Sequence, residues 1–237
     1  IENLTEEWGG LLLTGPEARN VLSQCTQEDL SNNAFSWLSC KTIKIDSADV
    51  FAMRVSYAGE LGWELHMPSW QVISIYESLF EMGSPLGLKD FGGQAFNSMR
   101  LEKMYRAYGA EFTEEISALE AGMERFLDLN RDFIGADNIR ERMSSGIKTK
   151  LAYLIFDDQI PAECFGNEAV FSDGELTGII TSGAYGYRVG HSIAFAYLKT
   201  EHCNDGVNLT VETSLGSRSC HVSMNASYDQ NNEKLCS

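Results

Sequence analysis

The sequence predicts an α+β protein in which a mixed domain is followed by an all-β domain. In the first part, apolar runs with strand character alternate with segments whose apolar residues recur every three or four positions. From residue 147 onward, short apolar runs are separated by Gly, Asn and Asp turns, as in small antiparallel barrels or sandwiches. We therefore expect an α+β domain over residues 1–146 and a small antiparallel β domain over residues 147–237.

The first domain opens on LLLTGPEARNVLSQ, residues 11–24, which predicts a short strand, a Gly-Pro turn and a helix with Pro16 at its first position. Ser69 is a plausible N-cap for the next helix, and Gly83 a sensible stop. Strands are expected at 41–46 and 50–57, and further helices at 69–83, 91–105 and 136–143.

The second domain reads as a series of short strands joined by turns. The glycine-rich segment GAYGYRVG, residues 183–190, lies between two of these strands and predicts a hairpin loop. The expected strands cover residues 151–156, 168–171, 176–182, 192–198, 207–213 and 217–224.

Composition excludes several classes of protein. Acidic residues outnumber basic ones by 34 to 18, a net charge of −16 that disfavours nucleic acid and anionic membranes as partners. No apolar run approaches the ~20 residues of a membrane span, and no secretory signal is visible. Six scattered cysteines and four isolated histidines form no metal-binding spacing, and phosphate-binding loops are absent. We expect a reduced, intracellular protein: cytoplasmic, or in the mitochondrial matrix if eukaryotic.

One stretch, VSYAGELGWELHMP at residues 55–68, allows two interpretations. Its alternation of apolar and polar residues is typical of a half-buried strand, but glycine is a poor choice inside a strand. If residues 58–62 form a turn instead, Tyr57 and Glu64 could face one ligand. A carboxylate accepting two hydrogen bonds beside an aromatic wall suits a flat, nitrogen-rich heterocycle.

A second stretch, NSMRLEKMYRAYG at residues 97–109, is the densest basic and aromatic cluster of an acidic chain. Arg100 could receive a carboxylate-bearing ligand as a fork-shaped donor. The alternative is a solvated helix face on which Glu102 pairs with Arg106, four residues away. Spacing alone leaves these two interpretations open.

Together these stretches resemble the folate-binding aminomethyltransferase domains of the glycine-cleavage T-protein type. The two stretches are followed in order by LEAGMERFLDLNRDFIGADNI and GIITSGAYGYRVGHSIAFAYL, so that the resemblance spans nearly the whole chain. The segment G-E-L-G-W-E-L is most similar to a segment in the C-terminal half of dimethylglycine and sarcosine dehydrogenases. The resemblance implies a folate-binding α+β domain followed by a β-barrel domain.

The resemblance also implies a set of site residues. Tyr57 and Glu64 match the tyrosine and glutamate that contact the pterin, Arg100 the motif arginine, and Tyr105 the tyrosine that follows it. The glutamate tail of a folate would need a local cation, for which Arg188 is a weak candidate. Two departures stand out. The catalytic aspartate of the family is expected upstream of this chain, and Met104 occupies a position that is usually glycine.

The function that the resemblance implies is that of a tetrahydrofolate-binding part of a flavin-dependent demethylase. A preceding flavin (FAD) domain of the same polypeptide would oxidise an N-methyl amine such as dimethylglycine or sarcosine to an iminium, and the folate would accept its one-carbon unit. We expect this chain to be a fragment, incomplete for catalysis alone. The alternatives are a glycine-cleavage T-protein and a non-catalytic regulatory protein built on the same fold.

Overall fold

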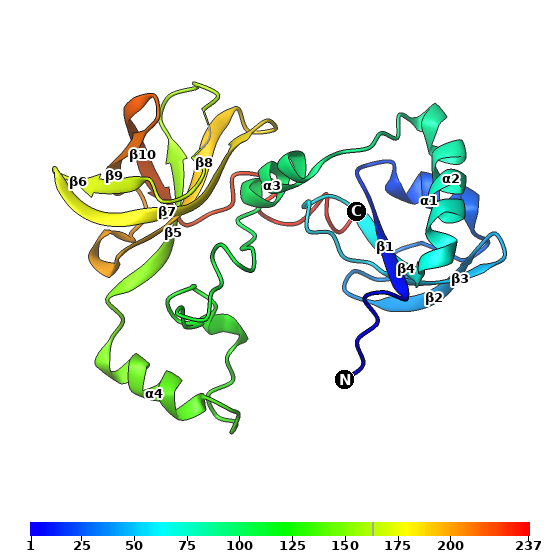
Figure 1. Ribbon diagram of the computed structural model, residues 1–237, viewed down its shortest axis with the longest axis horizontal. Helices are drawn as coiled ribbons and strands as arrows, with labels where there is room; N and C mark the ends of the chain where they lie inside the picture. Colours follow the sequence, from blue (N-terminus) through cyan, green and yellow to red (C-terminus); the bar gives the residue numbers. More distant parts are fainter. Residues whose placement is uncertain (163) are drawn as a thin grey trace. The chain divides into compact units, whose positions relative to one another are not determined.

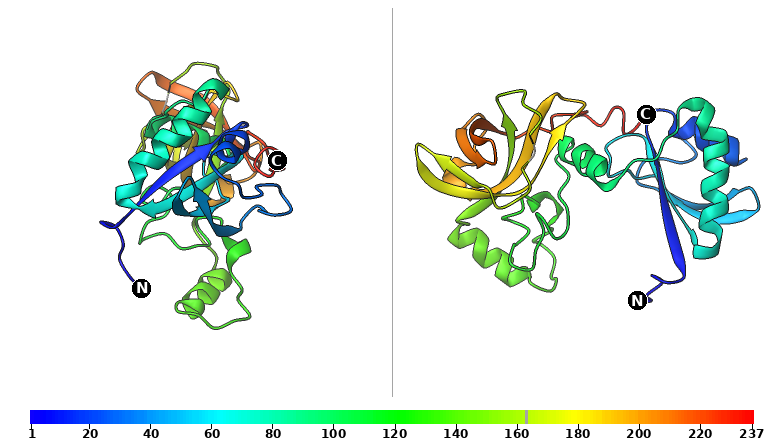
Figure 2. Two further views of the ribbon diagram at one scale, coloured as in Figure 1. Left: turned by 90° about the vertical axis from the view of Figure 1, so that its right-hand side faces the viewer. Right: turned by 45° about the horizontal axis from the view of Figure 1, so that its top comes forward.

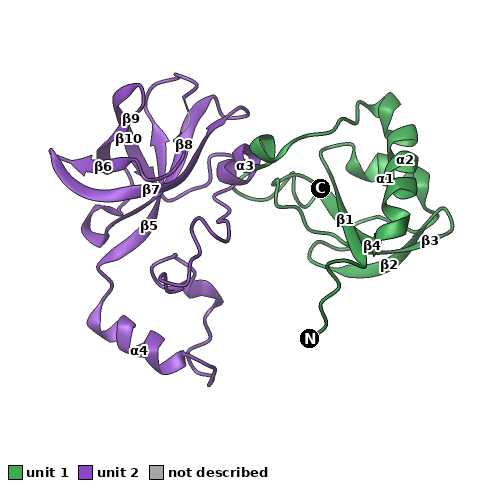
Figure 3. Cartoon of the chain, viewed as in Figure 1, with its two compact units in different colours: residues 1–96, 229–237 green, residues 97–228 purple. Residues whose placement is uncertain are grey.

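The computed structural model of the protein describes residues 1–162 and 164–237. The chain divides into two compact units, which Figure 3 distinguishes by colour. The N-terminal unit comprises residues 1–96 together with the C-terminal segment 229–237, and the barrel unit comprises residues 97–228. Each unit is described separately below.

The N-terminal unit is an antiparallel sheet of four strands in the order β1-β4-β3-β2. Figure 2 shows helices α1 and α2 lying together beside this sheet, and both helices contact it, α2 at β1 and α1 at β4. The elements are β1 (Trp8–Thr14), α1 (Ala18–Cys25), β2 (Cys40–Ile45), β3 (Ala48–Met53), β4 (Gly62–Pro68) and α2 (Val72–Gly83).

The core of this unit lies between the sheet and the two helices. Strand β4 alternates strictly, with Trp63, Leu65 and Met67 at 0% exposure and Glu64 and His66 on the opposite face. The helices contribute Val21 and Leu22 of α1 and Ile75 and Leu79 of α2 to the same cluster. The helices therefore cover one face of the sheet, and Glu64 belongs to the other.

The barrel unit contains the antiparallel β-barrel that the sequence predicts. Its six strands close in the order β10-β5-β8-β7-β6-β9, and they form the left-hand part of Figure 1. Every expected strand of the second domain is present, to within a few residues at each end. The strands are β5 (Thr149–Phe156), β6 (Ala169–Ser172), β7 (Glu175–Gly186), β8 (His191–Lys199), β9 (Asn208–Thr213) and β10 (Gly216–Ser223).

Residues 97–146 pack with the barrel unit, and they include α4 (Ala136–Ser145) and the last six residues of α3 (Gly93–Glu102). Asn97 and Ser98 of α3 donate hydrogen bonds to the main-chain oxygens of Gly183 and Tyr185 in β7. The compact units thus divide within α3 rather than near residue 146. The domain boundary expected at residue 146 remains a prediction, because domains along a sequence need not coincide with the compact units of the structure.

Four local expectations are corrected by the structure. Helix α1 begins at Ala18 with Glu17 as its N-cap, so Pro16 is not its first residue. Ser69 opens a single 3₁₀ turn, Ser69–Gln71, ahead of α2 and does not cap the helix with its side chain. The strand expected at 50–57 ends at Met53, and the helix expected at 91–105 ends at Glu102. None of the helices in the described part of the chain is long and apolar enough to cross a lipid bilayer.

Candidate functional site

The stretch 55–68 is a turn followed by a strand, which decides the question that its pattern raised. Gly59 has a φ of 75°, a conformation that glycine adopts without a side-chain clash. A Cβ at Gly62 would lie 2.7 Å from the main-chain oxygen of Leu13 in the paired strand β1. Gly59 is therefore favoured by its positive φ, and Gly62 by its close approach to the backbone of β1. Strand β4 begins only after the turn.

Glu64 stands on the sheet face that the helices leave uncovered. Its side chain is 35% exposed, and it lies opposite Leu12 of β1 and Met53 of β3 in the strand ladders. One carboxylate oxygen, Oε2, is 3.4 Å from Nε2 of His66. An ionised carboxylate offers about four acceptor positions, so most of this capacity is available to donors of a ligand.

His66 is a neighbour that the sequence did not single out as part of this site. It stands opposite Gly10 in the ladder, and a Cβ at Gly10 would lie 3.3 Å from Nδ1 of His66. Glycine at this position therefore makes room for the imidazole beside β1.

Tyr57 lies half buried in the turn, where its ring packs against an aromatic side chain of α3. The ring centroids of Tyr57 and Phe96 are 5.4 Å apart, and those of Phe96 and Phe91 are 6.2 Å apart. Sequence spacing gave no signal for this contact, because the partner follows 39 positions later, in a helix. The tyrosine is thus held by aromatic packing.

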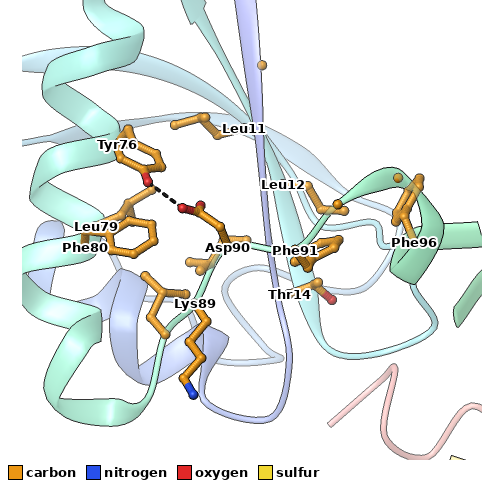
Figure 4. Close-up of a pocket in the computed structure, with 15 residues that line it drawn as sticks. Leu11, Leu12, Thr14, Tyr76, Leu79, Phe80, Lys89, Asp90, Phe91 and Phe96 are labelled. Atoms are coloured by element: carbon orange, nitrogen blue, oxygen red, sulfur yellow. Dashed lines mark hydrogen bonds between the residues drawn. The ribbon is translucent and has the colours of Figure 1, made fainter. Parts of the chain in front are cut away.

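An apolar pocket of about 400 Å³ lies in the N-terminal unit, lined by residues of β1, of α2 and of the segment 88–96. Figure 4 shows Phe91, Phe96 and Leu12 at one side of it. Tyr76 and Asp90, joined by a hydrogen bond of 2.9 Å, lie at another side. Of the lining residues, Phe96 packs against Tyr57, and Leu12 pairs with Glu64 in the strand ladder.

Arg100 lies in the barrel unit and is 2% exposed, so the predicted solvated helix face does not form. Its donors are used inside the protein, and Nη1 pairs with the buried carboxylate of Glu111 at 2.8 Å. An external carboxylate would have to displace one of these partners. The remaining bonds run from Nε to Asn97 Oδ1 at 3.0 Å, from Nη1 to Tyr105 O at 2.9 Å and from Nη2 to Ser182 Oγ at 2.9 Å.

Tyr105 directly follows the C-terminal cap of α3. The amide of Tyr105 donates to Arg100 O at 2.9 Å and the amide of Met104 to Leu101 O at 2.9 Å, while Met104 has a φ of 55°. This pair of bonds with a left-handed residue is the Schellman motif, in which the left-handed position is usually glycine. The geometry explains why a glycine would suit position 104, and it sets where the half-buried Tyr105 leaves the helix.

The other charged residues of this region are also engaged. Glu102 pairs with Nε of Arg188 rather than with Arg106, and it accepts the main-chain amide of Arg188 at 2.8 Å. The Arg188 guanidinium lies 3.8 Å from the centre of the Tyr228 ring. Arg188 is therefore part of a packed cluster, which weakens its candidacy for a ligand's carboxylate.

The sequence did not single out Glu111, which proves to be the centre of the Arg100 network. The carboxylate is completely buried and accepts hydrogen bonds from Thr181 Oγ1 at 2.8 Å, from Ser182 Oγ and from Ala107 N at 2.8 Å. Burial, and then the charge of Glu111, raise the pKa of the Tyr197 phenol, which therefore stays a neutral donor to Glu111 O. No spacing rule connects residues 100, 111 and 182.

Among the side chains that the structure describes, no group of three or more His, Cys, Asp or Glu residues is arranged to hold a metal ion. All six cysteines are free thiols.

The two units define a class of proteins in which a mixed domain of helices and strands is followed by a closed antiparallel barrel. Comparison with known families identifies the family within this class. Residues 1–131 match the GCVT N-terminal domain, and residues 150–229 match the glycine cleavage T-protein C-terminal barrel domain. The chain therefore belongs to the glycine-cleavage T-protein family.

Three similar proteins bear the names of enzymes. Human mitochondrial dimethylglycine dehydrogenase is 39% identical over 215 residues, covering 90% of this chain and 25% of the relative. Human mitochondrial sarcosine dehydrogenase is 31% identical, covering 82% of this chain and 21% of the relative. The aminomethyltransferase of Thermoanaerobacter pseudethanolicus is 30% identical, covering 89% and 57%. The chain thus spans about a quarter of the length of the dehydrogenases that it matches.

The fold has a counterpart among solved structures. The glycine cleavage system aminomethyltransferase T from Bartonella henselae superposes with a TM-score of 0.82, covering 94% of this chain and 60% of that protein. Sequence identity to it is 21%, so this likeness supports the fold alone.

Proposed function

We propose that this chain is the tetrahydrofolate-binding, one-carbon-accepting part of a dimethylglycine or sarcosine dehydrogenase-like demethylase. Membership of the T-protein family over both units supports it, as does the 39% identity to a dimethylglycine dehydrogenase. In this proposal a flavin domain elsewhere in the same polypeptide supplies the one-carbon unit, and the general-base aspartate also lies outside this chain. The mitochondrial names of the dehydrogenase relatives favour the matrix as its location.

The observation that carries the proposal is the half-exposed carboxylate of Glu64 on the uncovered face of the sheet. Its ladder partner Leu12 lines an apolar pocket whose wall also includes Phe96. A pterin offers adjacent N–H donors on a flat ring, which a carboxylate can accept in pairs. Tyr57, packed on Phe96, would supply an aromatic wall and a hydroxyl. Arg100 and Tyr105 complete the proposed folate-binding set.

Replacement of Glu64 by glutamine tests this assignment. Glutamine keeps the shape but removes the charge and one acceptor. Because hydrogen bonds to charged groups contribute roughly 1.5–3 kcal/mol, we expect tetrahydrofolate to bind about tenfold more weakly. Affinity is measured by isothermal titration calorimetry under anaerobic conditions.

A matched control separates this effect from general loss of negative charge. Glu77 is exposed on α2, on the layer opposite to Glu64, and Glu77→Gln makes the same chemical change there. We expect wild-type affinity for that variant. Equal affinity of wild type and Glu64→Gln would contradict the proposed site, and absence of folate binding by the wild type would contradict the function.

A glycine-cleavage aminomethyltransferase is the second candidate, supported by 30% identity to a protein of that name. The two differ in what the complete gene encodes. Sequencing the DNA upstream of Ile1 would reveal a flavin-binding domain for the dehydrogenase, or a short aminomethyltransferase segment for the alternative.

A further inference from the structure

The residues just after α3 are held on both sides by one buried carboxylate. Glu111 accepts hydrogen bonds from Arg100 Nη1 at 2.8 Å and from Ala107 N at 2.8 Å. The same arginine nitrogen donates to Tyr105 O at 2.9 Å. Tyr105 therefore lies between two points that Glu111 fixes, one through Arg100 and one directly.

Glu111 is in turn held by two neighbouring residues of the barrel strand β7. Successive residues of a regular strand point to opposite faces, yet Thr181 Oγ1 and Ser182 Oγ both donate to Glu111 Oε1. The strand pairing explains this geometry. Ile180 pairs with Ala196 and Ser182 with Phe195, so Thr181 is an extra residue at a β-bulge. A bulge re-aims side chains, and here it turns both hydroxyls toward one carboxylate.

The burial of Glu111 and Arg100 restricts this ion pair to one geometry. Glu111 is 0% exposed and Arg100 is 2% exposed, so a charge left without its partner would be costly. The carboxylate has few alternative positions, because Oε1 is occupied by the hydroxyls of β7 and Oε2 by Arg100 and Ala107. A change in the bulge therefore reaches the main-chain oxygen of Tyr105 through three successive hydrogen bonds, by way of Glu111 and Arg100.

We propose that Glu111, held by the Thr181–Ser182 bulge, is a positioning residue that sets Tyr105 for folate binding through Arg100 and the backbone of Ala107. This inference rests on the proposed function, because it takes Tyr105 as a folate-binding residue. It gives Arg100 a supporting role, consistent with a guanidinium whose donors are used within the protein.

The bulge hydroxyls provide the mildest test, because Glu111→Gln leaves a buried guanidinium partly uncompensated and can prevent folding. Thr181→Val and Ser182→Ala each remove one hydrogen bond to Glu111 without removing a charge, and Ser182→Ala also removes the acceptor of Arg100 Nη2. Ser192→Ala is the matched control, since Ser192 is another buried barrel hydroxyl, bonded to the main-chain oxygens of Ile160 and Ala162.

The first readout is independent of any ligand. The 237-residue protein is labelled with 3-fluorotyrosine, and the ¹⁹F resonance of Tyr105 is assigned by its loss in Tyr105→Phe. We expect Thr181→Val and Ser182→Ala to shift or broaden this resonance and Ser192→Ala to leave it in place. An unmoved Tyr105 resonance in both bulge variants would overturn the proposal.

The second readout is tetrahydrofolate affinity in a double-mutant cycle. We expect each bulge variant to weaken binding about three- to tenfold in the wild-type background. In the Tyr105→Ala background the same changes should have no further effect, because their action passes through Tyr105. A purely structural loss would instead weaken binding equally in both backgrounds, and that result would overturn the proposal.

Failure of this inference differs from failure of the proposed function. If wild type binds folate and Glu64→Gln weakens binding, while Tyr105→Ala binds normally, the positioning role is overturned and the function stands. If wild type shows no folate binding, the function fails, and the Tyr105 resonance alone reports whether Glu111 positions this residue.

Discussion

At the scale of one residue, Met104 combines favourable side-chain packing with an unfavourable backbone conformation. It occupies the left-handed position of the Schellman motif with a φ of 55°, which costs a residue with a Cβ about 1 kcal/mol. Its side chain packs against the cluster around Leu101 and Phe195. At position 104, packing therefore stabilises the folded state and backbone strain destabilises it.

Comparison of two variants at position 104 isolates the strain. Met104→Ala loses the packing and keeps the Cβ, whereas Met104→Gly loses the packing and the strain together. We expect Met104→Gly to be about 1 kcal/mol more stable than Met104→Ala, measured by urea unfolding followed by circular dichroism. If the alanine variant is equally or more stable, position 104 carries no strain of this kind.

At the scale of elements, an ion pair ties the segment after β5 to the neighbouring strand β10. Arg218 is buried and donates from Nε to Asp158 Oδ2 at 3.0 Å and from Nη2 to Asp158 Oδ1 at 2.6 Å. It also donates to Ala162 O at 3.0 Å, and its guanidinium lies 4.4 Å from the centre of the Phe156 ring. One side chain thus fixes the residues that leave β5.

The Asp158 pair predicts how barrel stability depends on pH. The hydrogen bond from Arg218 is the largest factor that lowers the pKa of Asp158. The ionised form therefore stabilises the folded state above the unfolded pKa of about 3.9, and this contribution is lost as the pH falls through the lower folded value. We expect Asp158→Asn to lower the melting temperature at pH 7 and to reduce its pH dependence below about pH 4.

Asp157→Asn is the control for this measurement. Asp157 is adjacent in sequence, and its carboxylate is 2.8 Å from Nδ1 of the partly exposed His221, so it does not contact Arg218. Melting temperatures by calorimetry between pH 7 and pH 2.5 compare the variants. A pH profile of Asp158→Asn parallel to that of wild type would contradict the role of the pair.

At the scale of the whole molecule, the chain passes from the N-terminal unit to the barrel unit and returns at residue 229. The returning segment packs into the N-terminal unit, where Leu235 is 3% exposed. Arg54, which is 1% exposed, donates to the main-chain oxygens of Cys236 at 3.3 Å and Ser237 at 2.9 Å. The last residues therefore complete the core of the unit formed by the first ones.

Removal of residues 229–237 should destabilise the N-terminal unit. It exposes the surface that Leu235 covers, worth about 1.5–3 kcal/mol, and it leaves the buried Arg54 short of acceptors. We expect faster hydrogen exchange in β1 and β4, measured by mass spectrometry, and little change in β5 and β8. Glu233→Ala, at an exposed position of the same segment, should exchange like wild type. Unchanged exchange in β4 of the shortened protein would exclude this role.

Local patterns were sufficient for the strands of the barrel unit, whereas their closure into a barrel was expected from the family resemblance. Turn residues at short intervals predicted all six strands of β5 to β10, because strand alternation and glycine turns are properties of neighbouring residues. Segment ends were predicted less well. The end of α3 at Glu102 depends on a cap held by Arg100 and on a left-handed Met104, and neither is visible in hydrophobic spacing.

The sequence by itself determined the family and the order of the elements, and it predicted Tyr57, Glu64, Arg100 and Tyr105 as binding residues, because motifs and periodicity are local. Only the tertiary structure decided what surrounds them. It placed Phe96 against Tyr57 and set Glu64 on the uncovered face of the sheet. It also enclosed Arg100 with Glu111 and a bulge some 80 residues further along the chain. Such contacts depend on how distant segments pack, which no spacing along the chain encodes.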